Sequence, residues 1–417
     1  GQAHPARGVG EIYSINNLGA IIGALLAGFT LLPLLGVRGT VFIAVGLNLF
    51  AALIVILSEY RLRYWKQSLL AIAAAFGLGM VSTYSVEHIY RGGMYGISGQ
   101  DYFKGAQILF EGEGRLSTVT VMQVPSPEGP INRLFIDGQG SSSLRLSDIR
   151  VSVLLGYLPR WLRPELEDAA VIGFGVGGAS RVLANGVKTT AIEIEPEVVN
   201  AAPFFEELNR GIVEDPNHQI IYNDARNFLL RTKQKFGIIV NHPLDPNRAY
   251  SSLLFTHEFF NIVKSRLKPG GVYVQWFPVY NMSKQDFADL YTTLDSIFPY
   301  QIAFANSPHL KEIIFICSNE EIPFDRAVLT EAFKNRSPED QRLLRLAQLD
   351  NIRQLFDIKV VTNKDLAHYR EIGSLLTDDQ PRLEFTAAIN DITGNAGELI
   401  ISELSEIRRK NLLQERQ

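Results

Sequence analysis

The stretch that decides the fold is residues 171–199, VIGFGVGGASRVLANGVKTTAIEIEPEVV. An apolar run ends in glycines at 173, 175, 177 and 178, a helix-like stretch follows, and a second apolar run leads to Glu193 and Glu195. Glycines after a strand let the backbone approach a ligand that a Cβ atom would keep away, and an acidic residue about 20 positions later can bind ribose hydroxyls. The stretch therefore predicts nucleotide binding, although similar turns also serve plain packing.

Strand-like and helix-like segments alternate after residue 159. The strand-like segments are AAVIGFG, TTAIEIE, QIIYND, FGIIVNH and GGVYVQWF. Such alternation is typical of a doubly wound parallel sheet covered by helices, and such sheets bind ligands at the carboxyl ends of their strands. The glycine loop, Glu193, Asp224 and residues 241–245 each follow one strand, so we expect them to meet at one edge of the sheet.

Four parts of the chain differ in pattern. Runs such as LSTVTVMQV and NRLFIDG, separated by PSPEGP, predict β-hairpins, and the sequence after residue 320 is charged and helical, with its charges expected on solvated helix faces. We therefore predict an α/β fold. Its parts are a membrane region at 1–90, a small β region at 100–150, a Rossmann-like domain at 151–320 and a helical extension at 321–417.

Three uncharged apolar stretches, residues 18–35, 41–57 and 68–86, are each near the roughly 20 residues that cross hydrocarbon. We predict three transmembrane helices, and thus an integral protein of the bacterial inner membrane. Gly19 and Gly23 share one helix face, which suits close packing on another membrane helix of this chain or of a partner protein. The chain begins at Gly1 without a signal-peptide pattern, so we expect it to be the tail of a longer membrane protein.

The orientation of these helices has two conflicting indications. The segment YRLRYWK at 60–66 carries three basic residues, and the positive-inside rule would place it in the cytoplasm, with the domain after the third span on the opposite side. A domain that uses an adenosine compound is instead expected in the cytoplasm. We favour the cytoplasmic domain because the charge bias is small.

Composition excludes several classes of function. The net charge of −4 and the pI near 6.0 argue against nucleic-acid binding, which requires a basic face. The single cysteine, Cys317, excludes an internal disulfide and is expected in a buried strand. The seven histidines lack metal-ligand spacing, so we expect no metal site.

Residues 110–300 resemble the spermidine/spermine synthase family of aminopropyltransferases, and with the preceding helices they are similar to its membrane-fused bacterial branch. The resemblance rests on an ordered set of segments: EGEGRLSTVTV, LFIDGQG, LLGYLP, GFGVGG, EIEPEVV, NDARNFL, SSLLFTHEFF and LKPGGVYVQWFP, with LLTDDQPRLEF further on. An ordered set of this kind is far more specific than a lone glycine loop.

The resemblance implies a site for an S-adenosyl compound, either decarboxylated S-adenosylmethionine or S-adenosylmethionine itself. Gly173, Gly175 and Gly177 would surround the thioether and ribose, and Glu193 would bind the ribose hydroxyls. Asp224 and Ala225 would face the adenine, where a carboxylate can accept from the amino group and a small side chain leaves room for the ring. Glu195 lies two residues from Glu193, and capping the helix that opens at Pro196 is its alternative role.

The catalytic positions depart from the family pattern. The family has carboxylates in the glycine loop, before the Leu-Pro pair and after the fourth strand. This chain has Val176 and Val153 at the first two positions and Asn241, followed by His242, at the third. Asn241 cannot act as a base, His242 can, and Asp245 would substitute if the loop, which differs in length by one residue, is shaped differently.

These departures leave three functions open. The first is a membrane-anchored transferase of polyamine biosynthesis that moves an aminopropyl group to an amine, with putrescine a poor acceptor because a dication needs counter-charges. The second is a methyltransferase that uses S-adenosylmethionine. The third is a catalytically silent scaffold or accessory subunit of a membrane complex.

Overall fold

The computed structural model describes residues 5–59, 105–114, 116–248, 251–306, 311–393 and 397–414 of the 417-residue chain. The chain divides into two units, one formed by Gly1–Gly92 with Glu113–Thr118 and the other by Gly93–Gly112 with Val119–Gln417.

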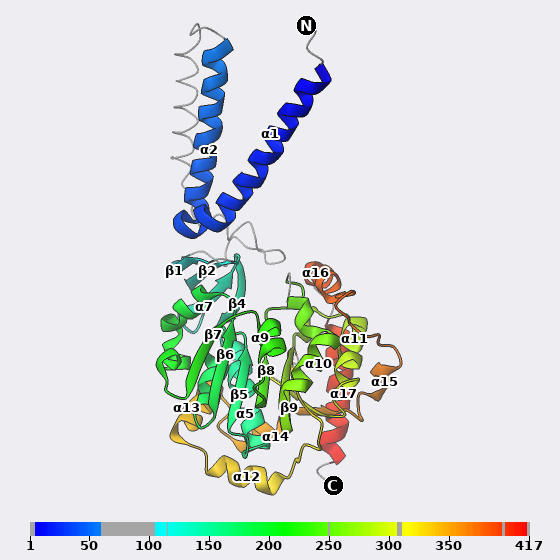
Figure 1. The fold of residues 1–417 in the computed structure, drawn as a ribbon. Coiled ribbons are helices and arrows are strands. Elements are labelled where there is room, and N and C mark those ends of the chain that lie inside the picture. Colours follow the sequence, from blue (N-terminus) through cyan, green and yellow to red (C-terminus); the bar gives the residue numbers. More distant parts are fainter. Residues whose placement is uncertain are drawn as a thin grey trace. The chain divides into compact units, whose positions relative to one another are not determined.

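The first unit contains helix α1 (Pro5–Leu26), a π-helical turn (Ala27–Leu31) and helix α2 (Leu32–Glu59) (Figure 1). Gly36 has a φ of 68°, which interrupts the helical backbone within α2. Among the described residues, Val9–Leu31 is long and apolar enough to cross a membrane, and none of it is buried. This helix overlaps the first predicted span.

The other two predicted spans have different outcomes. The second span, at 41–57, corresponds to the apolar helix Gly39–Val55, which is at the short end of the length that hydrocarbon requires. The third span, at 68–86, and the basic segment at 60–66 lie outside the described residues. Among the described residues, the structure therefore gives one helix of spanning length where the sequence predicts two spans.

The second unit opens with a four-stranded sheet in the order β1-β2-β3-β4. Its strands are β1 (Gln107–Glu113), β2 (Thr118–Val124), β3 (Ile131–Ile136) and β4 (Gln139–Ser143). The pairs β2–β3 and β3–β4 are antiparallel, which confirms the predicted hairpins. Helix α5 (Leu146–Leu162) then leads to the main sheet.

The main sheet has eight strands in the order β12-β10-β11-β9-β8-β5-β6-β7. Its parallel strands are β5 (Asp168–Ile172), β6 (Lys188–Glu193), β7 (His218–Tyr222), β8 (Phe236–Asn241) and β9 (Leu267–Phe277). The antiparallel strands are β10 (Tyr300–Ala305), β11 (Ile313–Ser318) and β12 (Lys359–Thr362). The five predicted strands correspond to β5 through β9, so the predicted Rossmann-like α/β fold is confirmed.

Short helices follow the parallel strands. They are α6 (Gly178–Ala184), α7 (Pro196–Asn200), α8 (Glu206–Asn209), α9 (Ala225–Arg231), α10 (His257–Arg266) and α11 (Lys284–Asp295), with 3₁₀ turns at Ala202–Phe205, Ile212–Glu214, Ser251–Phe255 and Val279–Asn281. Side-chain caps begin several of them, such as Asp224 on α9 and Thr256 on α10. Each cap satisfies backbone N–H groups that the first helical turn leaves without a partner.

The core consists of two apolar clusters, one on each face of the main sheet. Alternate residues of β5 belong to different clusters: Ala169 and Val171 lie in one, and Ala170 and Ile172 lie in the other. Successive strand side chains point to opposite faces, and every residue of β8 is buried, as expected for a central strand covered on both sides. Figure 1 shows the strands side by side in the middle of the unit, surrounded by helices.

The C-terminal part adds helices α12 (Arg326–Lys334), α13 (Pro338–Leu346), α14 (Ile352–Asp357), α15 (Ala367–Arg370), α16 (Leu383–Thr393) and α17 (Glu398–Gln414). It also contains β12, a strand of four residues that is too short to show an alternating pattern in the sequence. Cys317 is buried in β11, as predicted.

The charges of this part are not all solvated, in contrast to the prediction. Asp340 of α13 is 5% exposed. Its Oδ1 atom accepts from Arg160 Nη1 at 2.9 Å and from Asn185 Nδ2 at 3.1 Å. This carboxylate therefore joins the extension to α5 and to the end of α6.

The Asp340→Ala substitution should destabilise this unit, because it leaves Arg160 without its charged partner. We expect a loss of about 2 kcal/mol, measured as a fall in melting temperature of roughly 4–8 °C. The control is Glu331→Ala, which removes an ion pair with Lys334 on the exposed face of α12 and should change stability by less than about 0.5 kcal/mol. Equal melting temperatures for the two variants would show that Asp340 does not join the extension to the sheet domain.

Candidate functional site

The glycine loop follows β5 and has a backbone that favours glycine. Gly173, Gly175 and Gly177 have φ values of 82°, 55° and 79°, which side chains with a Cβ atom rarely adopt. A Cβ atom at position 173 would lie 2.8 Å from the carbonyl oxygen of His242. The loop therefore lies directly against the segment that follows β8.

Glu193, at the end of β6, holds this loop in place. Its Oε2 atom accepts from the backbone N–H of Phe174 at 2.8 Å, and its Oε1 atom accepts from the N–H groups of Ile194 at 2.8 Å and Glu195 at 3.0 Å. The side chain is 7% exposed, and burial raises its pKa although the three N–H groups act in the opposite direction. Of about four lone-pair positions on a carboxylate, three are occupied by the protein.

Two other acidic residues at this edge cap helices. Asp224 caps α9 through its Oδ1 atom, which accepts from Asn227 N at 2.7 Å. Glu195 caps α7 by accepting from Glu197 N at 3.3 Å, which confirms the capping alternative for this residue. Ala225 is the first residue of α9, and its side chain joins an apolar cluster of the core.

Asn241, at the end of β8, is completely buried. Its Nδ2 atom donates to the carbonyl oxygen of Leu254 at 3.1 Å and to Gln275 Oε1 at 2.9 Å. Val153 and Val176, the other two positions where the family pattern has carboxylates, lie in the apolar core. All three side chains thus lie inside the fold.

His242 lies between the glycine loop and β9. Its ring contacts Trp276 edge to face, with the two ring centroids 5.4 Å apart. Burial lowers the pKa of His242 to about 4, so the imidazole is neutral and a weak base at neutral pH.

Three carboxylates from separate segments interact electrostatically at this edge: Asp148 in the first turn of α5, Asp245 after β8, and Glu312 just before β11. Asp245 accepts from the hydroxyl of Tyr280 at 2.7 Å. Glu312 accepts from Trp276 Nε1 at 3.3 Å. We call Asp148, Asp245 and Glu312 the acidic cluster.

Glu312 and Tyr280 have raised pKa values at this edge. Burial raises the pKa of Glu312 to about 8, and the charges of Asp148 and Asp245 act in the same direction. Burial also raises the pKa of Tyr280, with further contributions from all three carboxylates. Within the described residues, no group of three or more potential ligands is arranged to hold a metal ion.

The sequence predicts only one member of this cluster, Asp245. Asp148 precedes the positions that the family pattern marks, and Glu312 is distant from every quoted segment. Glu312 reaches the edge because β11 is antiparallel to β9, with Ile313 opposite Phe277, so the beginning of β11 lies beside the end of β9. In the sequence, Glu312 is recognisable as a charged residue just before an apolar strand. That it lies beside the end of β9 becomes known only from the strand pairing.

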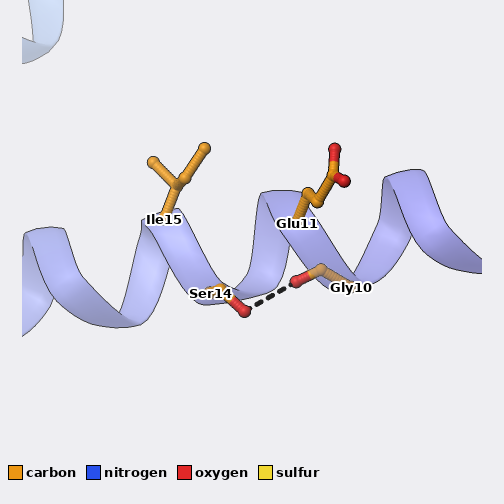
Figure 2. A pocket seen from close by; sticks show the side chains of 4 residues that line it. All are labelled: Gly10, Glu11, Ser14 and Ile15. Carbon is orange, nitrogen blue, oxygen red and sulfur yellow. Dashed lines mark hydrogen bonds between the residues drawn. The ribbon is translucent and has the colours of Figure 1, made fainter.

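A separate depression lies on α1 and is lined by Gly10, Glu11, Ser14 and Ile15 (Figure 2). The Ser14 hydroxyl donates to the Gly10 carbonyl at 2.9 Å. All four residues belong to one exposed helix, which offers a single wall and does not enclose a ligand. This depression belongs to the first unit and not to the edge of the sheet.

Known proteins are similar in sequence to the part of the chain that forms this edge. Residues 149–323 match the family model described as "Spermine/spermidine synthase domain". The polyamine aminopropyltransferase 2 of Aquifex aeolicus is 23% identical over 271 residues, which cover 64% of this chain and 52% of that protein. The polyamine aminopropyltransferase 1 of Streptomyces coelicolor is 26% identical over 283 residues, which cover 63% and 50% of the two proteins.

The chain thus spans about half the length of the curated relatives that it matches. Among solved structures, spermidine synthase from Thermotoga maritima aligns with 58% of this chain and 88% of its own, at 19% identity and a TM-score of 0.45. The match over residues 149–323 and the relatives that share it show that this part of the chain is similar to the spermine/spermidine synthase family.

Proposed function

We propose that the chain binds an S-adenosyl nucleoside along the carboxyl edge of the main sheet and transfers an aminopropyl group from decarboxylated S-adenosylmethionine to an amine. The order of the strands carries this proposal. Strands β7, β6, β5, β8 and β9 are consecutive neighbours, and they present in turn Asp224, Glu193, the glycine loop, Asp245 and Trp276. Five strands about 4.8 Å apart span roughly 19 Å, which accommodates a nucleoside with an extended three-carbon tail.

The nucleoside end of the edge combines polar and apolar surface. Tyr222 and Ile194, at the ends of β7 and β6, are 53% and 48% exposed, and such side chains suit the face of a purine. Asp224 would accept from the adenine amino group, beside the small Ala225. Glu193 retains about one lone-pair position for a ribose hydroxyl, so its main part would be to shape the loop that contacts the sugar.

The acidic cluster favours decarboxylated S-adenosylmethionine as the donor. The tail of this compound ends in an ammonium group, whereas the tail of S-adenosylmethionine also carries a carboxylate. Asp148, Asp245 and Glu312 would attract the first and repel the second. The cluster would also supply counter-charge for an amine acceptor, and of its three carboxylates the sequence pattern points only to Asp245.

A catalytically silent scaffold is the second candidate. It is favoured by Asn241, whose amide is buried and hydrogen-bonded where the family pattern has a carboxylate. Such a protein would bind the nucleoside and release no product. Methyl transfer from S-adenosylmethionine is less compatible with the acidic cluster.

Membrane anchoring is part of the proposal. The helix at Val9–Leu31 has a mean hydropathy of 1.5 and no buried residues, which is compatible with a span in the bacterial inner membrane. The domain would lie on the cytoplasmic side, where S-adenosyl compounds are made. Gly19 and Gly23 would contact a neighbouring helix.

Asp224→Asn should weaken binding of methylthioadenosine about tenfold. An amide has a single acceptor oxygen, which cannot both cap α9 and accept from the adenine amino group. The measurement is isothermal titration calorimetry. The control is Asp325→Asn, the same change at the cap of α12, which should leave affinity unchanged. Equal affinities for both variants and the wild type would remove Asp224 from the site.

Release of methylthioadenosine should require decarboxylated S-adenosylmethionine and an amine, and should not occur with S-adenosylmethionine. For putrescine we expect slow transfer, below about 1 per second, because no carboxylate occupies position 241. Asp245→Asn should lower kcat/KM at least tenfold, whereas the exposed Asp350→Asn should not. Tight nucleoside binding without release for any amine would favour the silent scaffold.

The full chain should remain in the membrane pellet after an alkaline carbonate wash, because three apolar stretches cannot all be hidden in a domain of this size. Deleting residues 1–90 should give a protein that is soluble without detergent. A full chain that is itself soluble without detergent would contradict the proposed anchoring.

A further inference from the structure

The transfer proposed above requires a group that removes a proton from the acceptor amine, since only the neutral amine is a nucleophile. The end of β8 does not supply a strong one. Asn241 is an amide, and His242 is a weak base because burial lowers its pKa to about 4. A stronger proton acceptor would have to come from another segment of this edge.

Glu312 is connected to the donor site by continuous contacts. The glycine loop lies against the carbonyl group of His242, the His242 ring contacts Trp276, and Trp276 donates to Glu312. The start of β11 also lies level with the end of β9. Glu312 is thus at the far end of the edge, where the tail of the donor would meet an acceptor.

Asn306 provides an independent indication of a ligand or an exchangeable proton at this point. It is 2% exposed, its Nδ2 atom donates to Glu312 Oε2, and its Oδ1 atom has no hydrogen-bond partner among the described residues. A buried amide oxygen without a partner costs about 1–3 kcal/mol. The Asn306 oxygen could accept a hydrogen bond from an ammonium group. If the Asn306 amide is rotated, the oxygen could instead accept from a protonated Glu312.

The charged groups around Glu312 make it receptive to a cation. Asp148 faces it from α5 and Asp245 from the loop after β8, with Tyr280 hydrogen-bonded to Asp245; Lys311 is its neighbour in the chain. Burial is the largest cause of its pKa of about 8, followed by the charge of Asp148. A bound ammonium would offset these negative charges and favour the ionised form.

We propose that Glu312 is the proton acceptor for the amine in aminopropyl transfer, in place of a carboxylate on β8; this inference rests on the proposed function. The Glu312 carboxylate takes a proton from the acceptor ammonium and becomes a carboxylic acid. The amine lone pair then forms a C–N bond to the aminopropyl carbon while the C–S bond breaks. Its electron pair goes to sulfur, which gives neutral methylthioadenosine, and Glu312 returns the proton to water.

Kinetics of methylthioadenosine release test this role. In the full chain, Glu312→Gln should lower kcat about 100-fold or more without changing the affinity for methylthioadenosine, and Glu312→Asp should restore part of the rate. Wild-type kcat/KM should rise as pH increases through about 8, because it reports the free enzyme, in which Glu312 must be in its carboxylate form, whereas the residual kcat/KM of Glu312→Gln should follow deprotonation of the amine itself. The control is the exposed Glu371→Gln, which should behave like the wild type.

A second measurement does not depend on turnover. Calorimetric titration of putrescine into the methylthioadenosine complex at pH 7, in buffers of different ionisation enthalpy, should show release of close to one proton in the wild type and in Glu371→Gln. Glu312→Gln should release much less.

The outcomes separate the two proposals. Wild-type kcat or undiminished proton release in Glu312→Gln, with nucleoside still bound, would overturn the role of Glu312 alone. Failure of methylthioadenosine to bind the wild type would overturn the proposed function, and the role of Glu312 with it.

Discussion

The geometry of the site depends on the buried carboxylate of Glu193. It accepts from three backbone N–H groups, one in the glycine loop and two just beyond β6. Because the side chain is buried, removing these bonds would leave several polar groups without partners at once. This one side chain therefore fixes the positions of two strand ends, and the other side chains of the proposed nucleoside site are placed relative to them.

The second determinant of the site is the direction of the strands. Parallel strands β5 to β9 all end at the same edge, and the antiparallel β11 begins there. The edge can therefore collect side chains that are far apart in the chain, such as Asp148 and Glu312. At one end it presents exposed apolar and hydrogen-bonding groups, and at the other a group of carboxylates. The proposed ligand differs between its ends in the same way, with an adenosyl group at one end and a cationic tail at the other.

The Rossmann-like fold could be predicted from the sequence because its signals are local. Apolar runs and glycines mark each strand and turn, and the end of each strand identifies Glu193 and Asp224 without knowledge of any contact. The helix cap at Glu195 also follows from neighbouring residues. In contrast, β12 has only four residues, and its pairing with β10 is not encoded in its own pattern.

The acidic cluster could not be predicted for a different reason. Its members belong to α5, to the loop after β8 and to the start of β11, and only the tertiary fold brings them together. The family pattern drew attention to Val153, Val176 and Asn241, which are buried within the fold, and away from Asp148 and Glu312. The edge therefore carries more negative charge than the carboxylates at the expected positions indicate.

The C-terminal segment is tied to the same edge. Asp378 pairs with Arg226 of α9, with Nη1 and Oδ1 2.8 Å apart, and accepts from the Thr256 hydroxyl at 2.8 Å. The Ser252 hydroxyl donates to Glu384 at 3.1 Å. The part of the chain that matches the family model ends at residue 323, well before these contacts. The residues that hold this end of α9 and α10 therefore lie beyond the matched region, so the ribosome adds them only after the whole matched region has been made.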